Sequence, residues 1–323
     1  MVNLIHQVED IINVETNNNV KIYDTMIDQI FYRAVEVNGL SIFYRECGTH
    51  EQPVLLLLHG FPSSSHMYRD LITDLSGTFH IVAPDYPGFG QSSAPGVREF
   101  DYSFDNLSEV IERFIDQLQL KDINLYMQDY GGPIGFRIAN RRPELIRSLI
   151  IQNANAYKDG LGSLLEPLTS YFQNPDKENE NKVRFFLTPD ATKWQYINGA
   201  SEVHKVNPDS YITDQYYLNR EGNDEIQLAL FRDYGSNHSR YDEWHRYFST
   251  YKPDTLVIWG KNDEMFITAG AEAYKRDLPD AEIIQLDGGH CLLEEHHRQV
   301  AQFIARFINP GINEAASTSI RTK

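Results

Sequence analysis

Three side chains in this sequence could together carry out nucleophilic substitution at carbon. Asp129 and Asp263 each follow a short apolar segment, and His290 follows another such segment and two glycines. A carboxylate with an unperturbed pKa near ~3.9 is ionised at neutral pH, so Asp129 could attack an sp³ carbon without a base and form an ester. Asp263 could orient the imidazole of His290, which would then take a proton from the water that hydrolyses this ester.

Each of these positions also has a purely structural interpretation. An aspartate at position 129 could cap the N-terminus of the helix that follows it. Asp263 could cap a helix that begins near Thr268, and Glu264 is a weaker candidate for the orienting acid. The sequence QDYGG at 128–132 favours the catalytic interpretation, because a tight strand-to-helix turn would push Asp129 out over the end of its strand.

Attack of water on an ester carbonyl creates an oxyanion, which needs hydrogen-bond donors. The sequence HGFP at 59–62 follows an apolar strand segment and could present the backbone N–H of Phe61. The N–H of Tyr130, directly after Asp129, is the second candidate donor. Aromatic residues near these positions predict an apolar substrate pocket. The residues that we expect to border it are His59, Pro62, Phe172 and Trp194.

The composition excludes several classes of protein. The 323 residues include 29 Lys and Arg against 46 Asp and Glu, giving a net charge of −17, while 41% apolar residues suffice for a buried core. Such a charge repels nucleic acids and anionic lipid surfaces. Two cysteines predict neither a disulfide framework nor a thiolate metal cluster. Because residues 1–30 lack the pattern of a signal peptide and no segment approaches the ~18 apolar residues of a membrane span, we expect a cytoplasmic protein.

The chain from residue 31 onward alternates between strand-like and helix-like segments. Strands separated by helices require crossover connections, which predict a mostly parallel eight-stranded sheet with helices on both faces, an α/β fold. Asn38-Gly39 predicts a hairpin between the first two strands. The expected strands are 31–37, 41–45, 53–58, 79–83, 123–127, 146–152, 255–259 and 282–286, and the expected helices are 66–75, 104–118, 132–140, 269–278 and 292–308.

One long segment, 157–251, interrupts this alternation. It is rich in aromatic residues and Asn, with helix-like stretches at 164–173 and 225–247. Because it is inserted between two strands, we expect it to lie as a lid over the carboxyl edge of the sheet, where open α/β folds bind ligands. The predicted domains are an N-terminal arm at 1–30, a core at 31–156 and 252–310, a helical cap at 157–251 and a flexible tail at 311–323.

These features resemble the α/β-hydrolase superfamily, in particular its epoxide hydrolases and haloalkane dehalogenases, which use an aspartate nucleophile. The likeness extends over about residues 31–308 and rests on HGFP, the loop at 85–92, the QDYGG turn, Asp263 and His290. The resemblance implies an α/β-hydrolase fold with a cap and a triad of nucleophile Asp129, acid Asp263 and base His290. It implies no metal and no organic cofactor, with a small apolar molecule and water as the reactants.

The two enzyme classes differ in how they stabilise the leaving group. Epoxide hydrolases use two lid tyrosines, whereas dehalogenases hold a halide with the Trp after the nucleophile and with an Asn or a second Trp. This chain has Phe61 where many dehalogenases have Asn, and Tyr130 instead of the Trp. It also departs from the superfamily at Met127, where a small residue is common. We therefore expect an epoxide hydrolase, with haloalkane dehalogenase as the alternative.

The resemblance also suggests the polarising tyrosines. FRDY at 231–234 resembles the segment that bears the second of them, which implies Tyr234. At the position of the first this chain has Leu168, so Tyr171 would have to substitute. Other lid tyrosines that could substitute are Tyr157, Tyr196, Tyr216 and Tyr217. Ligand receptors and cofactor-free oxygenases share this fold and remain further alternatives, although the intact triad argues against a pure receptor.

Overall fold

The computed structural model describes residues 29–310 of the 323-residue chain. The predicted tail at 311–323, and all but the last two residues of the predicted arm at 1–30, lie outside the described residues. Within 29–310, none of the helices combines the length and the apolar character needed to cross a membrane.

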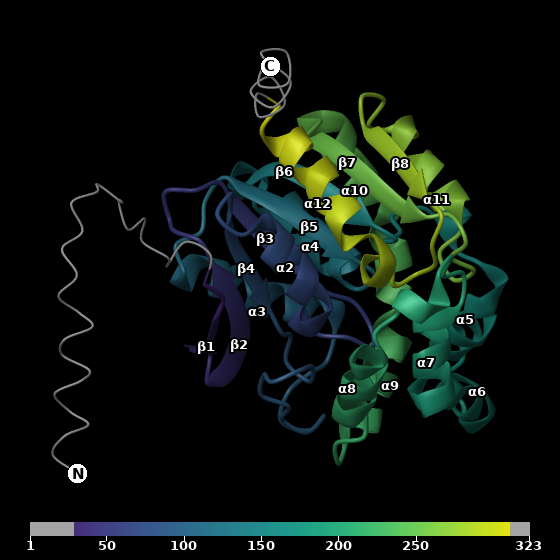
Figure 1. Ribbon diagram of the computed structural model, residues 1–323. Coiled ribbons are helices and arrows are strands. Elements are labelled where there is room, and N and C mark those ends of the chain that lie inside the picture. The colour runs from purple at the N-terminus through teal and green to yellow at the C-terminus, as the bar shows by residue number, and fades with distance from the viewer. Residues whose placement is uncertain (1–28, 311–323) are drawn as a thin grey trace, which may run out of the picture.

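Eight strands form one sheet in the order β1-β2-β4-β3-β5-β6-β7-β8 (Figure 1). The neighbouring strands from β4 through β3 to β8, in sheet order, pair in parallel, whereas β2 is antiparallel to both β1 and β4. These pairings confirm the predicted mostly parallel sheet and its N-terminal hairpin. The strands are β1 (Phe31–Val37), β2 (Leu40–Cys47), β3 (Val54–Leu58), β4 (His80–Pro84), β5 (Ile123–Gln128), β6 (Ile146–Gln152), β7 (Asp254–Gly260) and β8 (Glu282–Leu286).

Helices cover both faces of the sheet, which explains why β3 is apolar throughout. Leu56 and Leu58 belong to one hydrophobic cluster, and Leu55 and Leu57 belong to the other, on the opposite face. Successive side chains of a strand point to opposite faces, so a strand between two helical layers needs apolar residues at every position. The first cluster contains residues of α3 (Phe104–Gln117), α4 (Gly131–Arg141) and α11 (Thr268–Ala273), and the second contains residues of α2 (Arg69–Leu75) and α12 (Leu293–Ile308).

The chain between β6 and β7 forms a helical insertion, residues 157–251, most of which lies beside the sheet (Figure 1). The single helix predicted at 225–247 is wrong, because two helices meet there at Tyr234. Gly235 begins the second of them, and a Cβ at this position would lie 2.7 Å from the ring of Phe172. The helices of the insertion are α5 (Glu166–Gln173), α6 (Lys177–Val183), α7 (Pro189–Ile197), α8 (Pro208–Leu218), α9 (Asn223–Asp233) and α10 (Gly235–Tyr251).

Two predicted helices of the core are shorter than expected. The helix predicted at 66–75 begins with a 3₁₀ turn over Ser65–Tyr68, in which the hydroxyl of Ser64 accepts a hydrogen bond from the N–H of His66. The helix predicted at 269–278 ends at Ala273 and continues as a 3₁₀ turn over Tyr274–Arg276. Tightening into 3₁₀ turns is common at helix ends, where sequence patterns define boundaries poorly.

Candidate active site

Asp129 occupies a tight turn between β5 and α4. Its backbone φ of +49° is left-handed, a strained conformation for a residue other than glycine. Two glycines make room for this turn, because a Cβ at Gly131 would clash with the carbonyl oxygen of Leu58 in β3, and a Cβ at Gly60 would clash with the side chain of Asp129. The turn thus raises Asp129 above the carboxyl end of β5.

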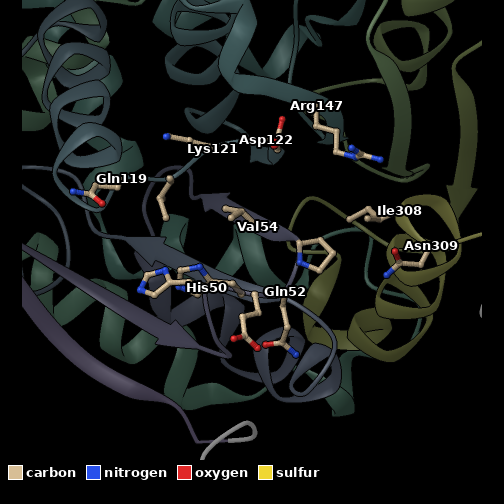
Figure 2. A pocket seen from close by; sticks show the side chains of 13 residues that line it. His50, Gln52, Val54, Gln119, Lys121, Asp122, Arg147, Ile308 and Asn309 are labelled. Carbon is tan, nitrogen blue, oxygen red and sulfur yellow. The ribbon is translucent and has the colours of Figure 1, made fainter.

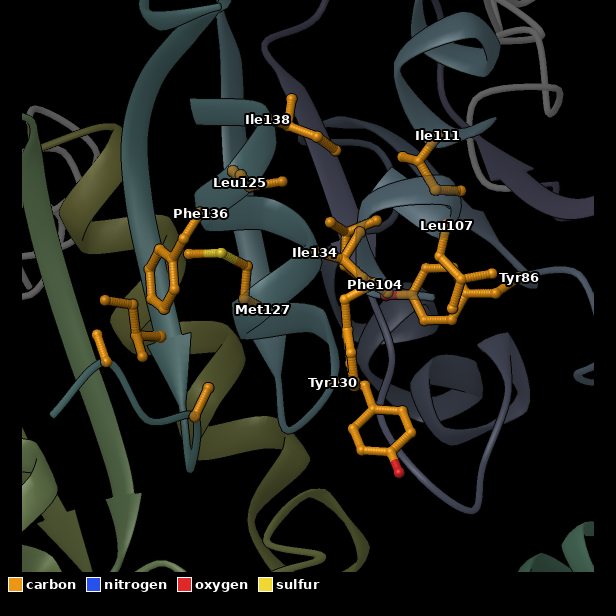
Figure 3. Packing of buried hydrophobic residues seen from close by; sticks show 14 of the residues in the cluster. Tyr86, Phe104, Leu107, Ile111, Leu125, Met127, Tyr130, Ile134, Phe136 and Ile138 are labelled. Carbon is orange, nitrogen blue, oxygen red and sulfur yellow. The ribbon is translucent and has the colours of Figure 1, made fainter. Parts of the chain in front are cut away.

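Met127, which departs from the small residue common at this position, is accommodated by Gly135. A Cβ at Gly135, in α4, would clash with the sulfur of Met127. Figure 3 shows Met127 beside Phe136 in the cluster between β5 and α4. The larger side chain in the strand is therefore matched by a missing side chain in the helix, and α4 keeps its close approach to the sheet.

The two oxygens of the buried Asp129 carboxylate have different surroundings. Oδ1 accepts a hydrogen bond of 2.7 Å from the backbone N–H of Phe61. The N–H of Tyr130 also donates to the carboxylate. Burial raises the pKa of Asp129, whereas His290 and these two N–H groups act to lower it. The two backbone donors predicted for the oxyanion thus both bind the nucleophile candidate.

His290 is oriented by Asp263, which β7 and the following turn bring to the same edge of the sheet. Nδ1 of His290 lies 2.7 Å from Oδ2 of Asp263. Oδ1 of Asp263 accepts hydrogen bonds from the N–H groups of Met265 and Phe266, at 2.8 and 3.0 Å. Because a carboxylate only accepts, Nδ1 of the neutral imidazole carries the proton and Nε2 keeps its lone pair. Glu264, the alternative acid, is exposed to solvent.

Nε2 of His290 faces the nucleophile candidate. It lies 3.9 Å from Oδ2 of Asp129, and both side chains are buried. Burial lowers the pKa of His290, but the Asp263 and Asp129 carboxylates raise it, and the net shift is upward. The charge of Asp129 is thus one of the factors that favour the imidazolium, and an ester at Asp129 would remove it.

Asn153, which the sequence analysis did not identify, fixes the position of Asp263. Its Nδ2 donates to Oδ2 of Asp263 at 2.8 Å, and its Oδ1 accepts from the N–H of Gly260 at 2.9 Å. Its backbone carbonyl accepts from the N–H of Asp129 at 3.3 Å. The one available signal was its place directly after β6, at the edge where the predicted catalytic residues gather.

A small, largely apolar cavity of about 40 Å³ contains the side chain of Asp129. Both the sheet edge and the insertion form its walls, as expected for a ligand site at this edge. The core contributes Phe61, Asp129, Tyr130, Met265 and Phe266, and the insertion contributes Leu165, Leu168, Phe186, Gln195, Phe231 and Tyr234.

None of the four residues predicted to border the pocket lines this cavity. His59 is fully buried in the core, and this burial lowers the pKa of its imidazole to about 4. Phe172 packs within the insertion, with its ring stacked 6.5 Å from that of Tyr234. Trp194 packs against the main hydrophobic cluster, and Pro62 lines a second, smaller cavity. Their aromatic or apolar character therefore serves packing around the site.

Of the two predicted polarising tyrosines, Tyr234 lines the cavity and Tyr171 does not. Tyr171 lies about one helical turn beyond the cavity-lining Leu168 in α5. The ring of Tyr130 lies 6.1 Å from that of Tyr234, and its hydroxyl is buried without a hydrogen-bond partner in the described part of the chain. Burial raises the pKa of both hydroxyls, at positions 130 and 234, well above the ordinary value, so both remain protonated donors.

Gln195 of α7 is a further polar residue of the cavity wall. Its side chain is 3% exposed, and its Nε2 has no hydrogen-bond partner among residues 29–310. A buried donor without a partner is destabilising, so a ligand acceptor within its reach would be favoured. No motif in the sequence singled out this residue.

A larger cavity, of about 510 Å³, lies at the opposite, amino edge of the sheet (Figure 2). Its wall includes Val54 and His80, the first residues of β3 and β4, together with Lys121 and Arg147. It contains none of the predicted catalytic residues. Between residues 29 and 310, no group of three His, Cys, Asp or Glu side chains is arranged to hold a metal ion.

Comparison with known proteins shows the family of the chain. Residues 53–297 match the family model described as the alpha/beta hydrolase fold. The chain belongs to this family. The matched residues of this α/β hydrolase run from β3 into α12 and include the turn at Asp129 as well as Asp263 and His290. The family resemblance expected from the sequence is thereby confirmed.

The α/β hydrolase also has close relatives. It is 38% identical over 279 residues to an uncharacterized hydrolase of Saccharomyces cerevisiae, covering 85% of this chain and 95% of that protein. It is 38% identical over 282 residues to a haloalkane dehalogenase of Psychrobacter cryohalolentis, covering 85% and 89%. The crystal structure of haloalkane dehalogenase DatA from Agrobacterium tumefaciens C58 shares the fold, with a TM-score of 0.74 at 22% identity over 88% of this chain and 97% of that one.

Proposed function

We propose that this α/β hydrolase opens a small apolar epoxide to a diol through an ester with Asp129. The observation that carries the proposal is the presence of two protonated tyrosines, Tyr130 and Tyr234, in the wall of the cavity that contains the Asp129 carboxylate. Negative charge develops on the epoxide oxygen as the ring opens, and preorganised hydroxyl donors stabilise charge at that place.

In the first step, Oδ2 of Asp129 attacks a ring carbon and the bond between that carbon and the epoxide oxygen breaks. Oδ1 remains hydrogen-bonded to the N–H of Phe61, so Oδ2 is the oxygen available to attack. The leaving oxygen stays attached to the product and receives a proton from a tyrosine hydroxyl. The product of this step is a hydroxyalkyl ester of the enzyme.

In the second step, His290 takes a proton from water at Nε2, and the water oxygen attacks the carbonyl carbon of the ester. The carbonyl oxygen becomes the oxyanion, already placed by its hydrogen bond to Phe61. When the bond to the alkyl oxygen breaks, His290 returns the proton to that oxygen. The diol leaves, and the Asp129 carboxyl group keeps the oxygen and the second proton of the water. That proton returns to the tyrosinate formed in the first step, which restores both the carboxylate and the tyrosine hydroxyl.

Within this proposal, Tyr130 takes the place that the sequence analysis gave to Tyr171. Tyr130 contributes twice, because its backbone N–H binds the carboxylate while its hydroxyl is buried without a partner among the described residues. The hydroxyl of Tyr234, from the insertion, is the second donor. The leaving oxygen would then lie between one donor from the core and one from the insertion.

Haloalkane dehalogenation is the second candidate, favoured by the 38% identity to the dehalogenase of Psychrobacter cryohalolentis. Its first step would use the same Asp129 but release a free halide. This chain offers neither an Asn at position 61 nor an indole at position 130 for that halide. The hydroxyl of Tyr130 would have to bind it instead.

Two substrates with the same carbon chain distinguish these reactions. We expect kcat/KM for 1,2-epoxybutane, measured as diol, to exceed that for 1-bromobutane, measured as bromide, by about tenfold or more, which is about 1.4 kcal/mol of transition-state stabilisation. Faster release of bromide than of diol would contradict the epoxide proposal. It would leave the ester mechanism intact, since both reactions pass through Asp129.

A further inference from the structure

The catalytic lone pair of His290 is already engaged by another side chain. Nε2 of Gln128 lies 3.0 Å from Nε2 of His290. Since Asp263 accepts the proton of Nδ1, Nε2 of the neutral imidazole is an acceptor, and the amide of Gln128 is the donor. The nitrogen that must take a proton from water therefore accepts a hydrogen bond from an amide in the free enzyme.

Gln128 is buried in this place. It is the last residue of β5, and its side chain is 2% exposed. A Cβ at position 60 would lie 2.3 Å from its Oε1, so Gly60 leaves room for the amide. An amide confined in this way fixes both the ring orientation and the tautomer of His290.

A second cavity begins at Gln128. Its volume of about 10 Å³ is close to the least that holds one water molecule. Phe61 lines both this cavity and the substrate cavity, so its side chain separates the two. The lining of this second cavity also includes Met67, Ser63, Tyr196 and Glu294.

We propose that Gln128 is a positioning residue for ester hydrolysis. It gives up its hydrogen bond to Nε2 of His290 when a water molecule from this second cavity donates to that nitrogen. The inference rests on the proposed ester mechanism and assigns the source and placement of its water. Gln128 donates to Nε2 of the neutral imidazole while the ester forms. Its amide then turns from His290 to the water, donating to the water oxygen while the water donates to Nε2.

The arrangement keeps the two reactants of the second step apart until they are needed. The substrate fills the apolar cavity over Asp129, and the water approaches from the other side of Phe61. The water loses one proton to Nε2 of His290 and forms a bond to the ester carbonyl carbon. The bond between that carbon and the alkyl oxygen then breaks, and the proton passes to this oxygen. The second proton of the water stays on the Asp129 carboxyl group until it restores the tyrosine hydroxyl, so atoms and charge balance.

The test compares the two steps separately in single turnovers with 1,2-epoxybutane. In Gln128→Met, which keeps the side-chain size but removes the amide, we expect ester formation to change by less than about threefold and ester hydrolysis to slow by about 10²-fold, in the range of general-base contributions. The ester should then accumulate and be visible as an adduct in the intact mass. Unchanged hydrolysis, or an equal loss in both steps, would overturn the proposal.

A matched pair at Met67 tests the cavity without touching Gln128. Met67→Phe fills the second cavity and should slow hydrolysis alone by about tenfold, whereas Met67→Leu should alter neither step. Full hydrolysis in Met67→Phe would contradict a supply of water from this side. If His290→Gln traps an ester but neither Gln128→Met nor Met67→Phe does, this inference fails while the proposed function stands. If His290→Gln traps none, the proposed function itself fails.

Discussion

Nε2 of His290 lies 3.9 Å from Oδ2 of Asp129, and the other oxygen of that carboxylate accepts a hydrogen bond from the N–H of Phe61. The two oxygens thus face different partners. One is placed to remain a carbonyl oxygen in an ester, and the other is placed to bond carbon within reach of a base. This division of roles within one carboxylate is the basis of the two-step reaction proposed for the site.

The hydrolysis step should accelerate as the pH rises. His290 acts as a base only when neutral, and the net raised pKa of its imidazole keeps it protonated to a higher pH than an unperturbed histidine. The Asp129 charge contributes to this increase, so esterification should lower the pKa of His290 again. In single turnovers, we expect the midpoint of the pH profile for ester hydrolysis to lie below the pKa of His290 measured by NMR in the free enzyme. A midpoint above it would contradict this coupling.

Removing either cavity hydroxyl should slow epoxide opening. Tyr130→Phe and Tyr234→Phe each lose a donor to the developing alkoxide, which we expect to raise the barrier of the first step by about 1–3 kcal/mol. The control is Tyr171→Phe, since Tyr171 lies outside the cavity and should retain full activity. An equal loss on 1-bromobutane and 1,2-epoxybutane in Tyr234→Phe would remove the reason for preferring epoxides.

Asn153 should matter for catalysis beyond its effect on stability. Asn153→Ala removes the 2.8 Å hydrogen bond to Asp263, and a hydrogen bond to a charged group contributes about 1.5–3 kcal/mol. We expect ester hydrolysis to slow more than ester formation, because Asp263 then orients His290 less well. Asn155→Ala is the control, since buried Asn155 bonds the carbonyl of Gly160 instead. If both variants slow hydrolysis equally, Asn153 is only a structural residue.

The contact between Met127 and Gly135 predicts a non-additive pair of substitutions. Gly135→Ala places a Cβ against the sulfur of Met127, and overpacking of this kind lowers the free energy of unfolding by about 1–3 kcal/mol. In a Met127→Ala background the same substitution should lower it far less, because the clash is gone. Urea unfolding of the four proteins measures both effects. Equal effects in the two backgrounds would show that the sulfur is not the obstacle.

The sequence predicted the sheet and the gathering of Asp129, Asp263 and His290 at one edge of it, because both depend on local patterns. Apolar strands followed by glycine-rich turns indicated where Asp129, Asp263 and His290 would stand, and parallel strands bring their carboxyl ends to one edge. The position of the candidate oxyanion donor followed from the same logic, since the N–H of Phe61 belongs to a loop at that edge. The residues at the carboxyl ends of the strands could therefore be placed from the sequence alone.

The cavity wall could not be predicted in this way. Which face of α5 points inward depends on its packing against α9 and α10, so Leu168 rather than Tyr171 lines the cavity. The fit of the large Met127 side chain against Gly135 likewise depends on contact between two elements, β5 and α4. Gln128 was visible as part of the turn, but only its 3.0 Å contact with His290 indicates a role. Contacts between elements decide these features, and no local pattern encodes them.

The most direct test of the account is the intact mass of His290→Gln after exposure to 1,2-epoxybutane. Without its base the variant should form the ester and fail to hydrolyse it, so the protein mass should rise by the full mass of the epoxide, with the adduct on the peptide that contains Asp129. The double variant Asp129→Ala, His290→Gln should show no adduct. An unmodified mass in His290→Gln, or an adduct on another residue, would contradict the assignment of Asp129 as the nucleophile.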